Sequence, residues 1–416
     1  MDESHDSSQM DLSLIRLLTG PEENLCMIND TDQSIYAFRG ASINAVMNMR
    51  NVYPKMNIHI LNTNYRSTQT IVNASKSLIN KNPVFIEKQL KSNNEKGNPI
   101  ILFTEKDANK EADRIVKLIK LSVEKYGYSY SDVAVLYRMN FLSRQIEEAL
   151  LKYRIPYKIV GGINFYSRKE IKDIMSYFRM IINPYDETAF TRAISTPKRG
   201  IGDKSIEKIV VYAKENNCTL LESAQMVITS GKAKKSLTEF IEIIDKLETE
   251  VQESTPDQAI ETMLRLTNYI GYIKETEKND IAQDRIENIT ELIELSIHYE
   301  SIEDLSANIT LDSEMASKNE EEEDCVQLLT MHSSKGLEWN IVIVAGATEG
   351  TIPSYRATTT ADIEEERRLM YVALSRAKKL LFITRPNYTI KQGSYIRTQE
   401  SRFIGEIDAQ YMYKYA

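Results

Sequence analysis

Short runs of β-branched and aliphatic residues recur along the chain, and each run is followed by polar residues. Five such runs stand out: Leu25–Ile28, Ile58–Leu61, Asp132–Tyr137, Asn340–Ala345 and Leu380–Thr384. Continuous apolar strands of this kind are buried on both faces, as in parallel sheets covered by helices. Segments with helical periodicity, such as Glu111–Glu124 and Ser143–Lys152, lie between them. The alternation of strands and helices predicts doubly wound α/β domains.

The middle of the chain has a different pattern. From about Lys169 to Glu300 the periodicity is mostly helical, and Pro197–Gly202 has the composition of a turn between two helices. An acidic run, Asn319–Asp324, is most simply a solvated linker, and the buried-strand pattern resumes directly after it. This order predicts an α/β domain that is interrupted by a helical insertion.

Composition narrows the class of protein. The 416 residues are 42% hydrophobic and 27% charged, as in an ordinary soluble globular protein of two or three domains. A net charge of −8 does not indicate nucleic-acid binding, although a local groove can still bind DNA. Three widely spaced cysteines suit a reducing compartment. The sequence shows neither a signal peptide nor an apolar run of roughly 18 residues. We therefore expect a cytoplasmic protein with no membrane partner.

Two segments in the first part of the chain combine residues suited to base and phosphate recognition. Tyr36, Phe38 and Arg39 follow the first predicted strand, and Tyr65 and Arg66 follow the second. Aromatic rings stack on bases, and arginine binds phosphate. The structural alternatives are a tight turn with a core aromatic for the first segment and a helix cap for the second.

A third segment lies directly before the strand at 340–345. Thr330, His332 and Ser333 precede Lys335-Gly336. Hydroxyl and main-chain N–H groups beside a glycine can approach phosphates closely. The alternative is a buried polar cluster between strands.

The fourth segment, 364–377, has the apolar spacing of an amphipathic helix. Glu366 and Arg376 lie nearly three turns apart and are predicted to share one face. An arginine presented to a γ-phosphate can act as an arginine finger. The alternative is a helix whose charged side chains form ion pairs with one another on its surface.

In this order the four segments resemble the later motifs of superfamily 1 DNA helicases of the UvrD/Rep/PcrA type. Residues 132–144, 155–173, 285–291 and 401–403 also resemble family segments, so the resemblance covers nearly the whole chain. It implies two RecA-like domains that close on ATP with Mg²⁺ and step 3′→5′ along single-stranded DNA. Single/double-strand junctions are further implied partners, and DNA repair is one implied process.

The resemblance also implies roles for single residues. On the nucleotide side, Gln33 senses the γ-phosphate, Tyr65 stacks on adenine, Arg66 faces the γ-phosphate, Glu338 accepts a hydrogen bond from ribose, and Arg376 is the arginine finger. Arg368 is a support on the helix face. The implied DNA contacts are Tyr36, Phe38, Arg39, Arg138, Asn140, Arg144, Thr330, His332, Lys335 and Gly336.

The sequence departs from the family near its start. No Gly-x-x-x-x-Gly-Lys-[Ser/Thr] phosphate-binding loop occurs in it. Asp2 and Glu3 resemble the acidic signature in which the Asp binds Mg²⁺ and the Glu activates water, but Ser4 and His5 follow them. We expect carboxylates on a frayed terminus to be poorly preorganised. We also expect loose packing over roughly the first 50 residues.

The expected fold class is α/β: a RecA-like parallel-sheet core domain, interrupted by a mostly helical insertion domain and preceded by a truncated RecA-like remnant. The expected boundaries are 1–65 for the remnant without a phosphate-binding loop, 66–165 and 320–416 for the two parts of the second core domain, and 166–319 for the insertion.

Three functions are compatible with this sequence. The first is a helicase by descent that has little or no ATPase activity alone. The second is one half of a split helicase, with another chain supplying the loop-bearing half. The third is a non-catalytic DNA-binding or protein-interaction module, in which the helical insertion contacts duplex DNA or a protein.

Overall fold

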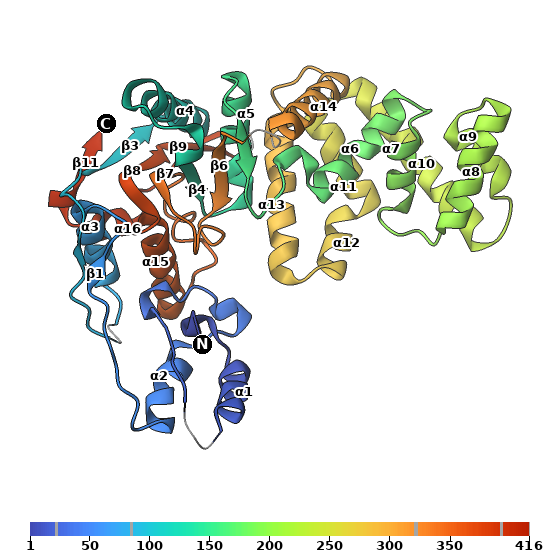
Figure 1. The fold of residues 1–416 in the computed structure, drawn as a ribbon. Coiled ribbons are helices and arrows are strands. Elements are labelled where there is room, and N and C mark those ends of the chain that lie inside the picture. Colours follow the sequence, from blue (N-terminus) through green and yellow to red (C-terminus); the bar gives the residue numbers. More distant parts are fainter. Residues whose placement is uncertain (21–23, 84–85, 320–322, 392–393, 416) are drawn as a thin grey trace. The chain divides into compact units, whose positions relative to one another are not determined.

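The computed structural model describes residues 1–20, 24–83, 86–319, 323–391 and 394–415 (Figure 1). These residues form two compact units. Unit 1 comprises Met1–Gly162, Asn319–Thr389 and Ile396–Ala416, and unit 2 comprises Ile163–Lys318 and Ile390–Tyr395. The chain therefore leaves unit 1 after residue 162, builds a second unit, and returns at residue 319.

Unit 1 is built around a seven-stranded sheet in which every neighbouring pair of strands is parallel. In spatial order the strands are β11 (Met412–Tyr415), β3 (Ile100–Glu105), β8 (Ala377–Pro386), β7 (Trp339–Val344), β4 (Val133–Tyr137), β6 (Val326–Thr330) and β5 (Tyr157–Ile159). Every residue of β4 is buried, as expected for a central strand covered on both faces. The fold class predicted from the sequence is confirmed as mixed α/β with a large parallel sheet.

Helices cover the sheet. Those of unit 1 are α1 (Gln9–Thr19), α2 (Ile43–Val52), α3 (Gln69–Ile79), α4 (Ala108–Tyr126), α5 (Ser143–Lys152), α15 (Thr360–Leu374) and α16 (Arg402–Glu406). Ala134 and Leu136 of β4 share one core with α3 and α15, so the alternate β4 side chains face the other side of the sheet. In Figure 1, α4 lies on the opposite side of the sheet from α15.

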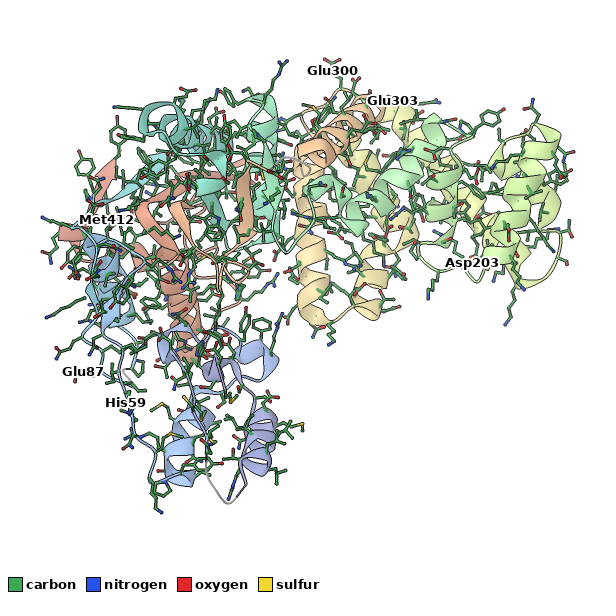
Figure 2. All side chains as sticks on the ribbon, in the orientation of Figure 1. His59, Glu87, Asp203, Glu300, Glu303 and Met412 are labelled. Carbon is green, nitrogen blue, oxygen red and sulfur yellow. The ribbon has the colours of Figure 1, made fainter. Side chains whose placement is uncertain are left out.

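Two of the five predicted strands do not form. Residues 25–28 and 58–61 have no strand geometry. Ile28 is 58% exposed and Leu61 is 86% exposed, although Leu25 and Met27 pack against the small core of the first 56 residues. A strand needs a hydrogen-bonded neighbour and a covered face, and a short apolar run specifies neither. Only the two-residue strands β1 (Thr63–Asn64) and β2 (Lys91–Ser92) pair in this region, flanked by extended stretches that carry His59 and Glu87 (Figure 2).

The first 56 residues enclose a small separate core. Its buried members are Leu12 of α1, Val46 and Met49 of α2, and Tyr53. The rest of α1 exposes large apolar side chains to solvent, namely Met10, Leu14, Leu17 and Leu18. Four buried side chains provide much less apolar burial than the core under the main sheet.

The described part of unit 2 between residues 169 and 319 is helical. The helices are α6 (Lys169–Ile182), α7 (Glu187–Ser195), α8 (Asp203–Asn216), α9 (Leu220–Val227), α10 (Gly231–Glu253), α11 (Pro256–Thr267), α12 (Tyr269–Thr276), α13 (Asn279–Ser296) and α14 (Ile302–Asn319). They enclose one hydrophobic core. The strands β9 (Tyr388–Lys391) and β10 (Ser394–Arg397) form a separate two-stranded sheet.

The turn predicted at residues 197–202 joins α7 to α8, as expected. Arg199 folds back into it and donates to the main-chain oxygens of Ala193 and Pro197 and to the Tyr177 hydroxyl. Part of the predicted acidic linker, residues 320–322, lies outside the described residues. Among the helices described, none combines the length and the apolar character needed to cross a membrane.

The difference in burial predicts different local stabilities within unit 1. We expect the amides of α1 and α2 to exchange with solvent at least about 100-fold faster than those of β4 and β7, because few buried contacts must open. Hydrogen–deuterium exchange resolved by peptide measures this, with the sheet strands as the internal reference. Equal protection of α1 and β4 would contradict the expectation of loose packing.

Candidate functional site

Arg376 lies between the end of α15 and the start of β8. The helix ends at Leu374, so Arg376 lies beyond it and does not share a helix face with Glu366. That prediction was wrong because the helix ends two residues before Arg376. Glu366 instead accepts three hydrogen bonds from Arg138, the shortest 2.7 Å. The Arg376 side chain is almost fully buried, with 1% of its surface exposed.

Hydrogen bonds fix the Arg376 guanidinium. It donates to the main-chain oxygens of Val372 at 3.0 Å and Leu337 at 3.3 Å, and to the Gln33 amide oxygen at 3.1 Å. None of the described carboxylates forms an ion pair with it. Burial and the nearby positive charge of Arg66 lower the pKa of Arg376 to about 10. The buried positive charge thus lies beside a second one, and no described carboxylate lies within ion-pair distance of it, although Glu338 and Asp30 are near enough to favour its charged form.

Arg66 lies close to Arg376, and both side chains contact Ser375. Arg66 donates to the main-chain oxygen of Ser375 at 3.4 Å, and the hydroxyl of that residue accepts from Arg376 at 2.9 Å. Arg66 is paired with Glu338, whose other oxygen lies 2.9 Å from the Lys378 ammonium. Hydrogen bonds from Lys378 and Arg66 lower the pKa of Glu338. The adjacent ring of Tyr65 is 73% exposed.

Gln33 connects this region to the N-terminal segment. Its amide nitrogen donates to Asp30 at 2.8 Å, while its amide oxygen accepts from Arg376. Lys88 bridges Asp30 and Asp32, with 2.7 Å to the latter. Arg368 of α15 donates to the Ser34 main-chain oxygen at 2.9 Å. Three cationic side chains, Arg376, Lys88 and Arg368, therefore hold the turn that carries Gln33 against the rest of unit 1.

Lys335 binds the same segment from the loop after β6. Its ammonium lies 2.7 Å from His5 Nε2, 2.6 Å from an Asp6 oxygen and 3.1 Å from the main-chain oxygen of Gln33. It also lies 5.3 Å from the centre of the Tyr36 ring. Sequence reasoning assigned Lys335 to DNA; in the structure only 9% of its side chain is exposed.

Glu3, His5 and Asp6 bring three possible metal-ligand atoms within 4.8 Å of one another. Their arrangement does not fit Mg²⁺, because that ion takes oxygen ligands, His5 offers nitrogen, and the Lys335 ammonium already lies among them. Burial, followed by the charge of Lys335, lowers the pKa of His5. The carboxylate of Asp2 is outside this cluster and accepts from the Glu3 main-chain nitrogen at 2.9 Å.

The expectation of a frayed terminus was wrong. The Met1 ammonium donates to the Cys26 oxygen at 2.7 Å, and Ser4 donates to the Ile28 oxygen at 2.9 Å. Ile28 in turn donates to the Met1 oxygen. These bonds to residues 26–28 hold Glu3, whose φ of 46° is in the left-handed region. Tertiary hydrogen bonds, which the sequence does not reveal, replace the missing strand pairing.

Three aromatic rings, those of Tyr36, Phe38 and His332, form a cluster. Phe38 is 62% exposed, and its ring meets those of Tyr36 and His332 edge to face, each at 5.8 Å between centroids. The Arg39 guanidinium lies 5.0 Å from the Tyr36 ring and 5.5 Å from the Phe38 ring. The predicted base-stacking and phosphate-binding residues are thus brought together from two distant segments.

The other predicted DNA contacts lie in different surroundings. The hydroxyls of Thr330 and Ser333 are 2.9 Å apart, and Gly336 has a φ of 84° with open space where a side chain would be. Asn140 is exposed, whereas Arg144 is 6% exposed and lies 2.8 Å from Glu148. The Arg144 guanidinium is therefore largely withdrawn from the surface.

Sequence reasoning missed Lys88 and His5 as parts of the site. Each is a polar residue without a motif of its own, and its importance comes from burial against Asp30 or Lys335. No periodicity or spacing in the sequence indicates that burial.

Burial of His332 predicts acid sensitivity. Burial, then the charges of Arg138 and Arg39, lower the pKa of His332 to about 3. Because this pKa is below the unfolded value, the stabilisation is complete above pH 6.5 and is lost as the pH falls toward 3. Relative to a His332→Gln variant, the parent should lose about 1 kcal/mol per pH unit between pH 6 and 4. Urea unfolding followed by tryptophan fluorescence measures this; a difference that stays constant with pH would refute it.

Comparison with known proteins identifies the family of this chain. A family model described as the UvrD-like helicase C-terminal domain matches residues 59–388, and one described as the UvrD/REP helicase N-terminal domain matches residues 1–54. The proteins named ATP-dependent DNA helicase PcrA from Staphylococcus epidermidis (strain ATCC 35984) and Staphylococcus aureus (strain Mu50) are each 36% identical over 98% of this chain. The chain covers 57% of each of these relatives, a little over half their length.

A solved structure, described as the C-terminal domain of a possible DNA helicase from Lactobacillus strain WCFS1, covers 84% of this chain and 98% of its own. It is 10% identical with a TM-score of 0.34. The match to the C-terminal family model spans well over half of the residues. The chain belongs to the UvrD/PcrA-type family of superfamily 1 helicases.

Proposed function

We propose that this chain is the nucleotide-sensing and DNA-gripping part of an ATP-dependent DNA helicase that moves 3′→5′ along single-stranded DNA. In this proposal residues 1–65 belong to the first RecA-like core domain, residues 66–165 and 320–416 form the second, and residues 166–319 are its insertion. The observation that carries the proposal is the buried Arg376, which lies near Arg66 and has no carboxylate partner among the described residues.

A phosphate is the natural partner for this arrangement. Two guanidiniums that bond to the same residue, Ser375, repel each other, and an anion between them would relieve that repulsion. Arg376 is held by main-chain oxygens and so needs little reorganisation. Arg376 would stabilise charge on the transferred γ-phosphoryl group, and Arg66 would bind the same phosphate. The exposed Tyr65 ring would stack on adenine.

Single-stranded DNA would lie over the aromatic cluster. The exposed Phe38 ring offers a stacking face, and the adjacent Arg39 offers a phosphate contact. His332 is kept neutral by burial, so it would contact bases or sugars without adding charge. Thr330 and Gly336 would approach the DNA backbone from the same loop region.

Gln33 would couple the two ligands. Its side chain accepts from Arg376, its main-chain oxygen accepts from Lys335, and Tyr36 follows three residues later. A γ-phosphate that takes the Arg376 hydrogen bond would release the Gln33 amide and let residues 33–39 adjust. Nucleotide state would thereby change the grip on DNA, a gating motion of the kind that moves many motors.

We propose that the 416-residue polypeptide, alone, does not turn over ATP. Residues 1–416 contain no Gly-x-x-x-x-Gly-Lys sequence, so no such loop is available to cradle the phosphates. Asp2 is exposed and offers one carboxylate to Mg²⁺, which in nucleotide sites takes one or two carboxylates together with phosphate oxygens. A second polypeptide bearing the loop would restore DNA-stimulated hydrolysis if this chain works as half of a split enzyme.

A second candidate is a DNA-binding module without catalysis. The aromatic cluster at Tyr36 and Phe38 favours it, since stacking needs no nucleotide. Contact with duplex at a junction would then use the turn at 197–202, where Lys198 is exposed. Single-strand affinity that is the same with and without an ATP analogue would favour this candidate over the motor.

Replacing Arg376 tests the nucleotide proposal. We expect Arg376→Ala to weaken binding of a non-hydrolysable ATP analogue by about tenfold or more, and of ADP much less, because the lost contact is to the γ-phosphate. The sole tryptophan, Trp339, is a suitable fluorescent reporter, since its main-chain nitrogen donates to the Arg376 oxygen at 3.0 Å. Arg397→Ala, an exposed arginine, is the control. Equal affinities of the parent and Arg376→Ala for the analogue would contradict the proposal.

Replacing Phe38 tests the DNA proposal separately. Loss of one stacking ring should cost about 1–3 kcal/mol, or roughly five- to 150-fold in affinity for oligo-dT. Fluorescence anisotropy with labelled oligo-dT measures this for Phe38→Ala. Tyr413→Ala, which removes a ring that is 60% exposed on strand β11, is the matched control. If both variants bind alike, the cluster around Phe38 is not the stacking site.

A further inference from the structure

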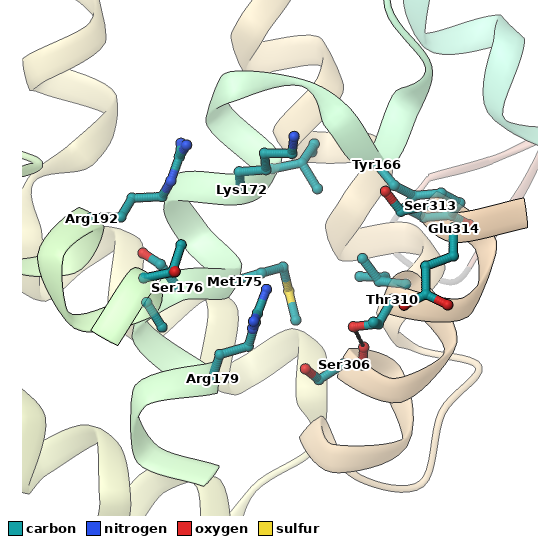
Figure 3. Close-up of a pocket in the computed structure, with 14 residues that line it drawn as sticks. Tyr166, Lys172, Met175, Ser176, Arg179, Arg192, Ser306, Thr310, Ser313 and Glu314 are labelled. Carbon is teal, nitrogen blue, oxygen red and sulfur yellow. Dashed lines mark hydrogen bonds between the residues drawn. The ribbon is translucent and has the colours of Figure 1, made fainter. Parts of the chain in front are cut away.

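Unit 2 contains a pocket that the proposed motor chemistry does not use. It lies between α6, α7 and α14 and has a volume of about 320 Å³ (Figure 3). This volume falls at the lower end of the range for small-molecule sites. All the residues that line it belong to unit 2.

Basic side chains gather at the pocket. Lys172, Arg179 and Arg192 line it together with one carboxylate, Glu314, while Asp186 and Asp173 pair with the two arginines from outside the lining. The whole chain carries a net charge of −8. Lys172 is exposed and forms no ion pair with any described residue. An ammonium without an ion-pair partner, beside two arginines with spare donors, favours an anionic ligand.

The two arginines keep donors available. Arg179 lies 2.8 Å from Asp186 and is 47% exposed, and Arg192 lies 2.7 Å from Asp173 and is 37% exposed. A guanidinium has five N–H donors, and one carboxylate uses at most two of them well. Each arginine is therefore oriented by its carboxylate and can still donate to an oxygen in the pocket.

A serine hydroxyl lies on the opposite wall. Ser306 of α14 lines the pocket and is 8% exposed, and its Oγ, which is not fully enclosed, forms no hydrogen bond with any residue in the described part of the chain. Its main-chain oxygen accepts from the Thr310 hydroxyl at 2.9 Å. Figure 3 shows Ser306 and Thr310 on the α14 side and Arg179 on the α6 side of the same space. The Ser306 hydroxyl is therefore available to donate to a ligand oxygen in the pocket.

The rest of the lining is apolar. Met175 and Ile171 of α6 and Ile309 of α14 are buried side chains, and the ring of Tyr166 closes one end. Cations and hydroxyls around an apolar floor suit a molecule with a charged end and a flat or apolar body. Inorganic phosphate alone would leave that floor uncovered.

We propose that unit 2 binds a small phosphorylated molecule of mononucleotide size. Its phosphate is held by Lys172 and Arg179 with the Ser306 hydroxyl, and its ring or apolar body covers Met175 and Ile309. This site is independent of the site at Arg376, so neither proposal stands or falls with the other.

The test uses the full chain and adenosine monophosphate as the probe. Calorimetry measures affinity, and hydrogen exchange by peptide reports where binding occurs. Saturable binding that slows exchange in α6 and α14 is expected. Lys172→Glu and Ser306→Ala should each weaken it by about fivefold or more. Lys208→Glu, an exposed lysine of α8, is the matched control and should bind as the parent does.

Three results would overturn the proposal. One is an absence of slowed exchange in α6 and α14 at saturating probe. Another is equal protection of these helices by adenosine, which lacks the phosphate. The third is protection by duplex DNA but not by the mononucleotide, which would assign the basic pocket to a DNA backbone. Slowed exchange confined to unit 1 would count as the first of these, since the probe would then occupy the site at Arg376.

Discussion

The arrangement of unit 1 depends on cations of the sheet domain that bind oxygens of the N-terminal segment. Lys335 binds His5, Asp6 and the Gln33 oxygen, Arg368 binds the Ser34 oxygen, and Lys88 bridges Asp30 and Asp32. This segment has only a small apolar core of its own. Charge-assisted hydrogen bonds, together with Ile35, which is fully buried in the core under the main sheet, therefore fix Gln33 beside Arg376. The hydrogen bonds can be exchanged for a ligand's oxygens, whereas the packed contact of Ile35 cannot be.

This constraint links structure to the proposed function. Arg376 is buried and held by main-chain oxygens, and its side-chain partners, the Gln33 amide and the Ser375 hydroxyl, are neutral. A phosphate competes well for a buried guanidinium against an amide. The same turn leads within a few residues to the exposed ring of Phe38. Residues 33–39 would therefore contact both proposed ligands, so a change in nucleotide binding at Gln33 would be passed directly to the DNA contact at Phe38.

Much of the sheet could be predicted from the sequence, and the reasons for success and failure are physical. The strands at 133–137 and 339–344 are apolar on both faces, a pattern that only a covered central strand satisfies. Residues 25–28 and 58–61 have similar composition but do not form strands. Cys26 and Ile28 instead bond to Met1 and Ser4, and such partners are not encoded locally. Arg376 and Phe38 were found through motifs. Lys88 and His5 were not, because their roles arise only from what the fold buries against them.

The most direct measurement is hydrogen exchange of residues 28–39 in a Lys335→Met variant, which keeps most of the side-chain stem and removes the charge. Loss of a buried ammonium from three partners should speed exchange of these amides by about tenfold or more and leave the amides of β4 unchanged. Unchanged exchange across residues 28–39 would show that the cation is not what holds the segment, and would contradict the account.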